Sequence, residues 1–133
     1  MDYVVPTTKT VPHVFDDSEA FTAMPQVFAT AFLVGLFERA CLDAIMPYLD
    51  WPAEQTVGTH IDVSHVAATP PDMTVTVDVE LTTIDRRRLV FDVTAHDGID
   101  EISRGRHERF VIDAATFTAR VAEKAARSDD TAT

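Results

Sequence analysis

A single carboxylate interrupts the most apolar stretch of the chain. Glu38 lies near the middle of residues 29–46, ATAFLVGLFERACLDAIM, which has the pattern of a buried helix. Burial of a carboxylate is costly unless it is paired, and burial raises its pKa toward the range of a base or nucleophile. Glu38 is therefore a catalytic group, half of a structural ion pair with an arginine of the neighbouring sheet, or a residue of a helix more exposed than its pattern indicates. The residues predicted to share its helical face are all apolar: Val34, Gly35, Cys41, Leu42 and Ile45.

Strand alternation sorts the histidines. In residues 59–67, THIDVSHVA, His65 falls on the apolar face with Ile61, and His60 falls on the polar face. His65 is thus predicted to point toward the core and His60 toward water. A lone inward histidine is more often a core residue than a catalyst, but an inward carboxylate on the covering helix favours a site. The pattern does not place His107, because Gly105 could break the alternation there.

Thr30 and Gly58 are two further candidates near Glu38 and His65. The Thr30 hydroxyl suits a helix N-cap, which is the structural interpretation, or a contact with a ligand. Thr30 and Glu38 lie about 12 Å apart along a helix axis, so they share a ligand only if the chain turns back or a second copy contributes. Gly58 falls within a strand pattern, which indicates either a β-bulge or an N–H that approaches an oxyanion.

Arginines gather at two places in the C-terminal half of the chain. Residues 86–88 lie at a predicted hairpin turn, and Arg104, Arg106 and Arg109 lie in the last predicted strand. Hairpin charges are usually solvated surface. On a chain this acidic, both groups are nevertheless the places where a phosphorylated carrier such as coenzyme A would bind.

The period of the hydrophobic pattern changes once and thereby indicates the fold. Residues 29–46 follow a helical period, which ends where Pro47 and Pro52 discourage further helix. A helix packed on a curved antiparallel sheet is an α+β arrangement of the hot-dog type. Its open sheet edge favours pairing of two copies into a homodimer. The period is two in four predicted strands joined by short links: 56–69, 73–85, 88–97 and 100–113.

The remaining segments are less regular. One further strand is predicted around residues 9–15, KTVPHVF, and residues 16–26 have the composition of a loop. The C-terminal sequence predicts a short amphipathic helix that fades into a polar tail. We therefore expect one domain over 1–124 and a disordered tail over 125–133.

Composition limits the classes of function. The 133 residues carry a formal net charge of -11, which disfavours binding to nucleic acid or anionic lipid. The single cysteine, Cys41, cannot form an internal disulfide, and no Cys/His cluster predicts a metal site. The sequence shows neither a secretion signal nor a membrane-spanning stretch, so a cytoplasmic protein is expected.

Four stretches of the sequence resemble the fluoroacetyl-CoA thioesterase group of the hot-dog superfamily. The resemblance extends over roughly residues 3–124 and implies a homodimeric enzyme that hydrolyses an acyl-CoA thioester without a metal or other cofactor. The stretches are MPQVFATAFLVGLFERACLDAIMPYL, GTHIDVSHVAATPP, TVTVDVELTTIDRRRL and AHDGIDEISRGRHERFVID.

The resemblance also implies roles for individual residues. The catalytic threonine, glutamate and histidine of the family correspond to Thr30, Glu38 and His65. The glycine that lines the acyl pocket and the pocket arginine correspond to Gly58 and Arg109. In these roles Glu38 attacks the thioester carbonyl or activates a water, His65 moves protons, and Thr30 keeps the groups in register.

One departure from the family concerns the lid over the acyl pocket. The family's lid carries two phenylalanines, and Phe21 matches one of them while Met24 replaces the other. Methionine is flexible, so this lid is expected to discriminate less sharply for a very small acyl group. The expected substrate is a short acyl-CoA, either fluoroacetyl-CoA or another small activated acyl group.

Two other functions are compatible with the same residues. A hot-dog acyl-CoA dehydratase or hydratase would use a histidine and a carboxylate to move a proton from carbon, and would release no thiol. A non-catalytic acyl-CoA-binding dimer would hold Glu38 and His65 as a buried structural pair. Thr30 and the matching motifs favour the thioesterase over the dehydratase or hydratase, and the binding dimer ranks below both enzymes.

Overall fold

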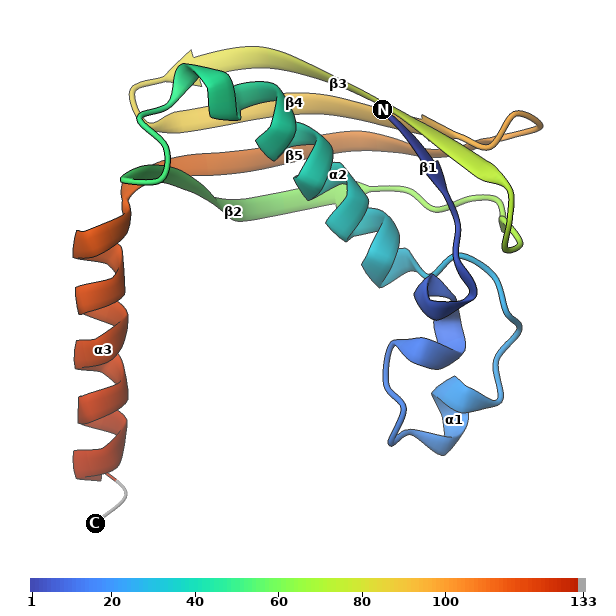
Figure 1. Cartoon of the computed structure of the whole chain (residues 1–133), viewed down its shortest axis with the longest axis horizontal. Helices are drawn as coiled ribbons and strands as arrows, with labels where there is room; N and C mark the ends of the chain where they lie inside the picture. Colours follow the sequence, from blue (N-terminus) through green and yellow to red (C-terminus); the bar gives the residue numbers. More distant parts are fainter. Residues whose placement is uncertain (132–133) are drawn as a thin grey trace.

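The computed structural model describes residues 1–131, and in it an antiparallel sheet curves around one long helix (Figure 1). The sheet has five strands in the order β1-β3-β4-β5-β2. The α+β architecture predicted from the sequence is confirmed. The strands are β1 Asp2–Val4, β2 Glu54–Val63, β3 Thr74–Asp85, β4 Arg88–His96 and β5 Glu101–Asp113. The α-helices are α1 Glu19–Thr22, α2 Thr30–Ile45 and α3 Ala114–Thr131.

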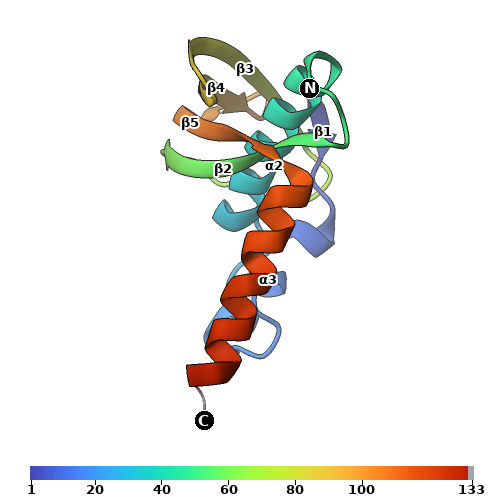
Figure 2. The ribbon, with the colours of Figure 1, turned by 90° about the vertical axis from the view of Figure 1, so that its left-hand side faces the viewer.

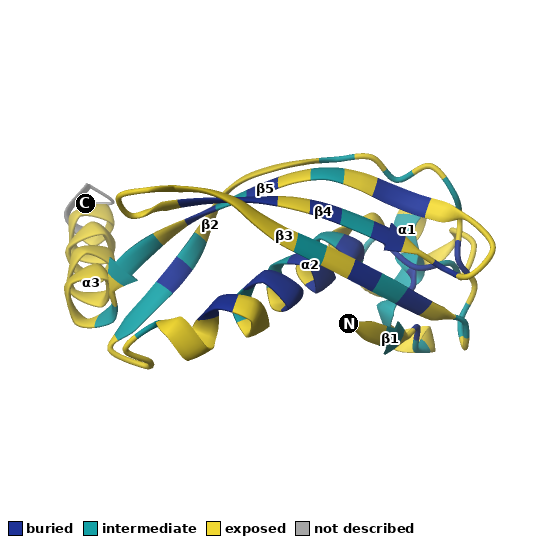
Figure 3. Cartoon of the chain, turned by 90° about the horizontal axis from the view of Figure 1, so that it is seen from above, coloured by how far each residue is buried: buried dark blue, intermediate teal, exposed yellow. Residues whose placement is uncertain are grey.

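Helix α2 supplies one side of the core. Its fully buried positions Leu33, Phe37 and Cys41 recur every four residues, which places them on one face. That face is buried and the opposite face is largely exposed (Figure 3). Across from it the sheet contributes Phe91 and Val93, also almost fully buried. Each such side chain contributes roughly 1.5–3 kcal/mol on burial, so the helix is positioned by packing.

The four predicted strands after Thr56 are present, but β2 runs only from Glu54 to Val63. The prediction of a strand over 56–69 is therefore wrong beyond Val63, and His65 lies in the loop that follows β2. Strand β2 forms one edge of the sheet and pairs only with β5, with a shift of register between Gly58 and His60. The two strands approach so closely that a Cβ on Gly105 would lie 2.0 Å from the carbonyl oxygen of Asp62. A side chain at position 105 would therefore separate them.

The N-terminal prediction is wrong in its position. Residues 9–15 do not form a strand, and two 3-10 turns occupy Thr7–Lys9 and Val11–His13. Pro12 lies in the second turn, where its missing N–H removes a donor that a strand would need. The strand of this region is β1, which pairs with β3. The predicted loop 16–26 contains α1, a short helix.

Helix α3 extends beyond the short helix predicted from the sequence. It runs from Ala114 to Thr131 and projects away from the sheet (Figures 1 and 2). A disordered tail was expected over 125–133, whereas the structure has helix as far as Thr131. Residues 132–133 lie outside the described residues. Ala, Glu, Lys and Arg are strong helix formers, which accounts for the extension. None of the helices in the described part of the chain is long and apolar enough to cross a membrane.

Asp97 links the β4–β5 turn to the loop after β2 through hydrogen bonds. Its Oδ1 accepts from the N–H groups of Ile99 and Asp100 at 3.0 and 2.8 Å, and its Oδ2 accepts from the Thr69 hydroxyl at 2.8 Å. Burial opposes ionisation of this carboxyl, but the hydrogen bonds outweigh it and hold the pKa of Asp97 below its ordinary value of 3.8. The loop that carries His65 is thus anchored by a charged group.

Asp97→Ala is expected to lower the free energy of unfolding by about 2 kcal/mol at pH 7, because one buried and two partly buried donors lose their acceptor. A lowered pKa means that the carboxylate stabilises the fold above pH 3.8 and that this contribution is lost as the pH falls further. Urea unfolding at pH 7 and pH 3.5 measures both effects. Asp100→Ala, which leaves the backbone bonds of the turn in place, is the control. An equal loss in the control would contradict the role given to Asp97.

Candidate active site

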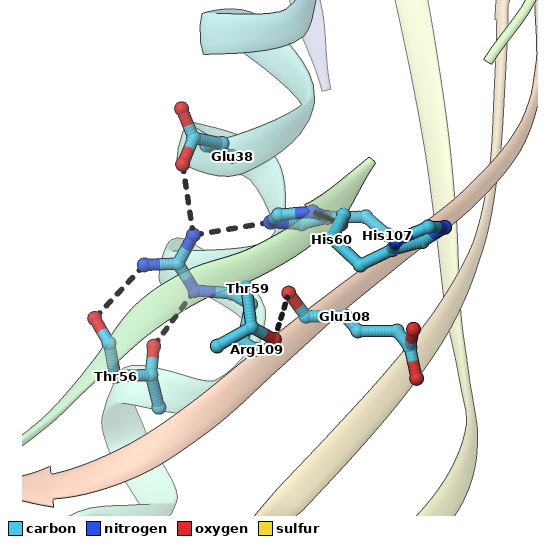
Figure 4. Close-up of polar contacts among 7 residues, drawn as sticks. All are labelled: Glu38, Thr56, Thr59, His60, His107, Glu108 and Arg109. Carbon is cyan, nitrogen blue, oxygen red and sulfur yellow. Dashed lines mark hydrogen bonds and ion pairs between the residues drawn. The ribbon is translucent and has the colours of Figure 1, made fainter. Parts of the chain in front are cut away.

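Glu38 lies at the margin of the buried face of α2. Its side chain is 42% exposed, and its Oε1 accepts a hydrogen bond from Nη1 of Arg109 at 3.2 Å (Figure 4). Arg109 comes from β5 and is only 4% exposed. Glu38 is thus more exposed than the apolar pattern around it indicates, and an ion pair with an arginine of the sheet is present. The ion pair is made by Oε1, and Oε2 takes no part in this hydrogen bond.

The Arg109 guanidinium is fixed by further acceptors. Its Nε donates to the Thr56 hydroxyl at 2.8 Å, and its Nη2 donates to the Thr56 carbonyl at 2.9 Å. Its Nη1 lies 3.1 Å from Nε2 of His107. A buried charge needs such partners to offset its desolvation. Arg109 therefore presents Nη1 to Glu38 from a constrained position (Figure 4).

Gly58 makes room for the Glu38 carboxylate. A Cβ built on Gly58 would lie 2.8 Å from Oε1 of Glu38 and 3.3 Å from Cε1 of His107. The β-bulge interpretation of this glycine is confirmed, because the register of β2 shifts between Gly58 and His60. Its backbone also lies close to the carboxylate, and donation of its N–H to an oxyanion stays a prediction. The surrounding cavity has a volume of about 450 Å³. It is lined by Val34, Glu38, Gly58, Thr59, His60, Ile61 and His107.

Thr30 and His65 form a second group. The Thr30 hydroxyl lies 2.7 Å from Nδ1 of His65. The N-cap of α2 is Ala29, and Thr30 is the first helical residue, so the capping interpretation of Thr30 is wrong. Burial lowers the pKa of His65, and its Nε2 is buried without a hydrogen-bond partner among the described residues. An unpartnered buried nitrogen is a position from which a proton can be transferred to or from a bound ligand.

The structure thus divides the predicted site residues among three places: the cavity beside Glu38, a second cavity, and the segment that includes α1. Glu38, Gly58 and Arg109 meet at the first cavity, whereas Thr30 and His65 line a separate cavity of about 270 Å³. The other residues of that second cavity are Val11, Val27, Phe28, Val66, Ala67 and Ala68.

Phe21 and Met24 lie on the segment that includes α1, before α2. The Phe21 ring packs on Phe15 with the ring centroids 5.3 Å apart, and Met24 is 51% exposed. Neither side chain lines the cavity of Glu38 within this chain. Within this chain the predicted lid residues are therefore apart from the carboxylate.

Comparison with known proteins decides the family. The family model for fluoroacetyl-CoA-specific thioesterases matches residues 8–115. The fluoroacetyl-CoA thioesterase of Streptantibioticus cattleyicolor is 53% identical over 123 residues, which are 92% of this chain and 88% of that protein. This chain belongs to the fluoroacetyl-CoA-specific thioesterase family. The resemblance seen in the sequence is confirmed.

Solved structures agree with membership of this family. A variant of the fluoroacetyl-CoA-specific thioesterase, in complex with fluoroacetate and CoA, is 52% identical and has a TM-score of 0.90 over 93% of this chain and 96% of that one. A hot-dog-like protein from Thermanaerovibrio acidaminovorans is 22% identical, with a TM-score of 0.78 over 93% of this chain and 87% of that one. The predicted hot-dog fold is confirmed.

Two residues of the site were not identified from the sequence: His107, which lines the first cavity, and Thr56, which accepts from Arg109. Strand alternation does extend through β5, since His107 and Arg109 are both buried and Phe110 is exposed. Counting back two residues from Arg109 would therefore have placed His107 on the face of the site. Thr56 stands two residues before Gly58, and the same count would have found it.

Other groups with reactive chemistry lie nearby. Burial raises the pKa of the Cys41 thiol to about 12, with Arg109 opposing this effect and Glu38 adding to it. The thiol of this family member is thus protonated and unsuited to act as a nucleophile. Within residues 1–131 no three His, Cys, Asp or Glu side chains gather as a metal site would require.

Proposed function

We propose that this protein hydrolyses a short acyl-CoA thioester, with the Glu38 carboxylate as nucleophile or general base. The observation that carries the proposal is the carboxylate held by Arg109 beside the backbone of Gly58, at the wall of a cavity. Membership of a thioesterase family supports the reaction class, and the relative crystallised with fluoroacetate and CoA supports an acyl-CoA substrate.

Two routes begin from this carboxylate. Attack of Glu38 on the thioester carbonyl forms a mixed anhydride and expels CoA thiolate, and water then hydrolyses the anhydride. Alternatively Glu38 takes a proton from water, which attacks the carbonyl directly. In both routes the N–H of Gly58 is the proposed donor to the carbonyl oxygen as it becomes negative.

We assign proton transfer to His65 and its positioning to Thr30. When the Thr30 hydroxyl donates to Nδ1, a neutral His65 carries its proton on Nε2, the nitrogen without a partner. A proton there can be donated to the leaving thiolate. This arrangement requires the cavity of Thr30 and His65 to open onto the substrate held at Glu38.

A second copy of the chain would bring the two groups together. Strand β2 is a sheet edge with one side unpaired in this chain, and its residues Thr59, His60 and Ile61 are exposed. Edge strands of this kind are commonly covered by pairing with a second copy. We therefore propose a homodimer in which Glu38 of one copy faces His65 of the other. A cytoplasmic location is also proposed, since the single cysteine is a free thiol.

Mixing two inactive variants tests the shared site. Glu38→Gln and His65→Ala are each expected to lose turnover, and subunit exchange between them is expected to restore roughly a quarter of the wild-type rate. Half of the dimers formed by random exchange are mixed, and each mixed dimer regains one of its two sites. Thiol release is followed after mixing, and each variant alone is the control. Exchange confirmed by mass spectrometry without recovered activity would show that each site lies within one protomer.

The function itself is tested by free-thiol release from a panel of acyl-CoAs that includes acetyl-CoA and fluoroacetyl-CoA. Catalytic release of CoA from at least one short acyl-CoA is expected. Hydration of crotonyl-CoA without thiol release would instead support the hydratase, and CoA binding without any turnover would support the binding dimer. Either result would exclude the proposed hydrolysis.

Met24→Phe is expected to raise the preference for fluoroacetyl-CoA over acetyl-CoA, measured as the ratio of the two kcat/KM values. A rigid ring in the proposed lid would enclose a small acyl group more closely, and a change of about tenfold is in the range of such packing effects. Met46→Phe, at another exposed methionine beyond α2, is the matched control. An unchanged ratio in Met24→Phe would remove the lid argument.

A further inference from the structure

His107 is held in one tautomer by its two neighbours. Its Nδ1 lies 2.8 Å from the carbonyl oxygen of His60, which can only accept, so Nδ1 carries the hydrogen. Its Nε2 faces Nη1 of Arg109 at 3.1 Å, and a guanidinium can only donate. Both neighbours therefore require a neutral ring with its lone pair on Nε2.

The surroundings of His107 favour this neutral form. The side chain is only 2% exposed. Burial lowers its pKa, and the positive charge of Arg109 acts in the same direction. The ring thus offers Arg109 an acceptor without a negative charge.

Nη1 of Arg109 carries two hydrogens and faces two acceptors. One is Nε2 of His107 at 3.1 Å and the other is Oε1 of Glu38 at 3.2 Å. Thr56 holds the other two nitrogens of the guanidinium. The two Thr56 bonds hold one side of the planar group, and the His107 bond adds an acceptor at Nη1 itself, so it helps to fix the direction in which Nη1 meets Glu38 (Figure 4).

We propose that His107 is a positioning residue for the reaction, acting through the Arg109 Nη1 bond to orient the Glu38 carboxylate. This inference rests on the proposed thioester hydrolysis, in which Glu38 performs the chemistry. Without an acceptor at Nε2, one hydrogen of Nη1 is buried and unpaired, and the guanidinium turns toward other partners. The carboxylate then loses its fixed orientation, whereas the contacts of the CoA moiety are left unchanged.

Two variants separate the two bonds of His107. In His107→Gln the amide reaches the position of Nε2 and its oxygen can accept from Arg109. In His107→Asn the shorter amide reaches the position of Nδ1 and keeps only the bond to the His60 carbonyl. We expect the Gln variant to retain kcat within about threefold, and the Asn variant to lose about 10- to 100-fold in kcat with KM within about twofold of wild type. Thermal unfolding of both variants measures any general loss of structure.

Equal losses of kcat in the two variants, or no loss in either, would overturn the proposal. A ¹⁵N spectrum of the histidine rings in the wild-type protein tests the geometry without relying on turnover, with the His107 signals assigned as those missing from His107→Gln. A ring protonated on Nδ1 alone at pH 7 supports the proposal, and a proton on Nε2 overturns it. Absence of thiol release by the wild type would count against the proposed function, and the tautomer would still decide whether His107 accepts from Arg109.

Discussion

Replacing Glu38 with Gln is expected to lower kcat for thioester hydrolysis by about 10³-fold while the protein stays folded. The amide can still accept from Nη1 of Arg109, so the site keeps its shape, but it can neither attack a carbonyl nor take a proton from water. Steady-state thiol release under saturating substrate measures the loss. Circular dichroism and thermal unfolding show whether the variant retains the fold.

Asp43→Asn is the matched control for this prediction. Asp43 is another carboxylate of α2, 60% exposed and 4.0 Å from Arg39, on a surface pair that has little effect on stability. Its replacement is expected to change kcat by less than about twofold. A folded Glu38→Gln protein with nearly normal kcat would reduce Glu38 to the structural partner of Arg109. The proposed mechanism would then be wrong.

Gly58→Ala is expected to lower kcat by roughly 100-fold with a much smaller effect on stability. The added Cβ would lie 2.8 Å from Oε1 of Glu38, so the carboxylate must move away from its position beside Arg109. The atom that has to move is the end of a flexible side chain, so the fold is expected to tolerate the change. A displacement of about 1 Å at a reacting group is sufficient for a loss of this size.

Gly35→Ala provides the comparison for Gly58→Ala. Gly35 lies on α2 one turn before Glu38, and a Cβ there has nothing within 4 Å. Alanine is the better helix former, so this variant is expected to gain about 1 kcal/mol in stability and to keep its activity. If Gly58→Ala retained wild-type kcat, the close approach of Gly58 to the carboxylate would have no role in the reaction.

Regular periodicity explains why most of the fold could be predicted. Helix α2 and strands β3, β4 and β5 bury one face over part or all of their length, and the hydrophobic pattern reflects that face directly. The N-terminal strand was misplaced because residues 9–15 have apolar side chains whose backbone forms 3-10 turns around Pro12. The length of α3 was underestimated because its polar composition resembles a disordered tail as well as an exposed helix.

The site was only partly accessible to the same reasoning. An unexplained carboxylate on an apolar helix identified Glu38, and strand parity identified His65. The Arg109 partner was one of several arginines in the pattern, and the resemblance to a known family selected it. His107 was left unplaced because Gly105 could have broken the alternation, whereas the structure keeps β5 regular through that glycine.

The sequence by itself determined the fold class, the family and the residue types available for the reaction, because periodicity and motifs are properties of the chain in order. The tertiary structure decided which of these residues meet. It joined Glu38 to Arg109 across 71 positions of the chain and Thr30 to His65 across 35, and placed the two pairs at different cavities. Contacts over such separations depend on strand register and on how the helix crosses the sheet, and both are set by packing of the whole core.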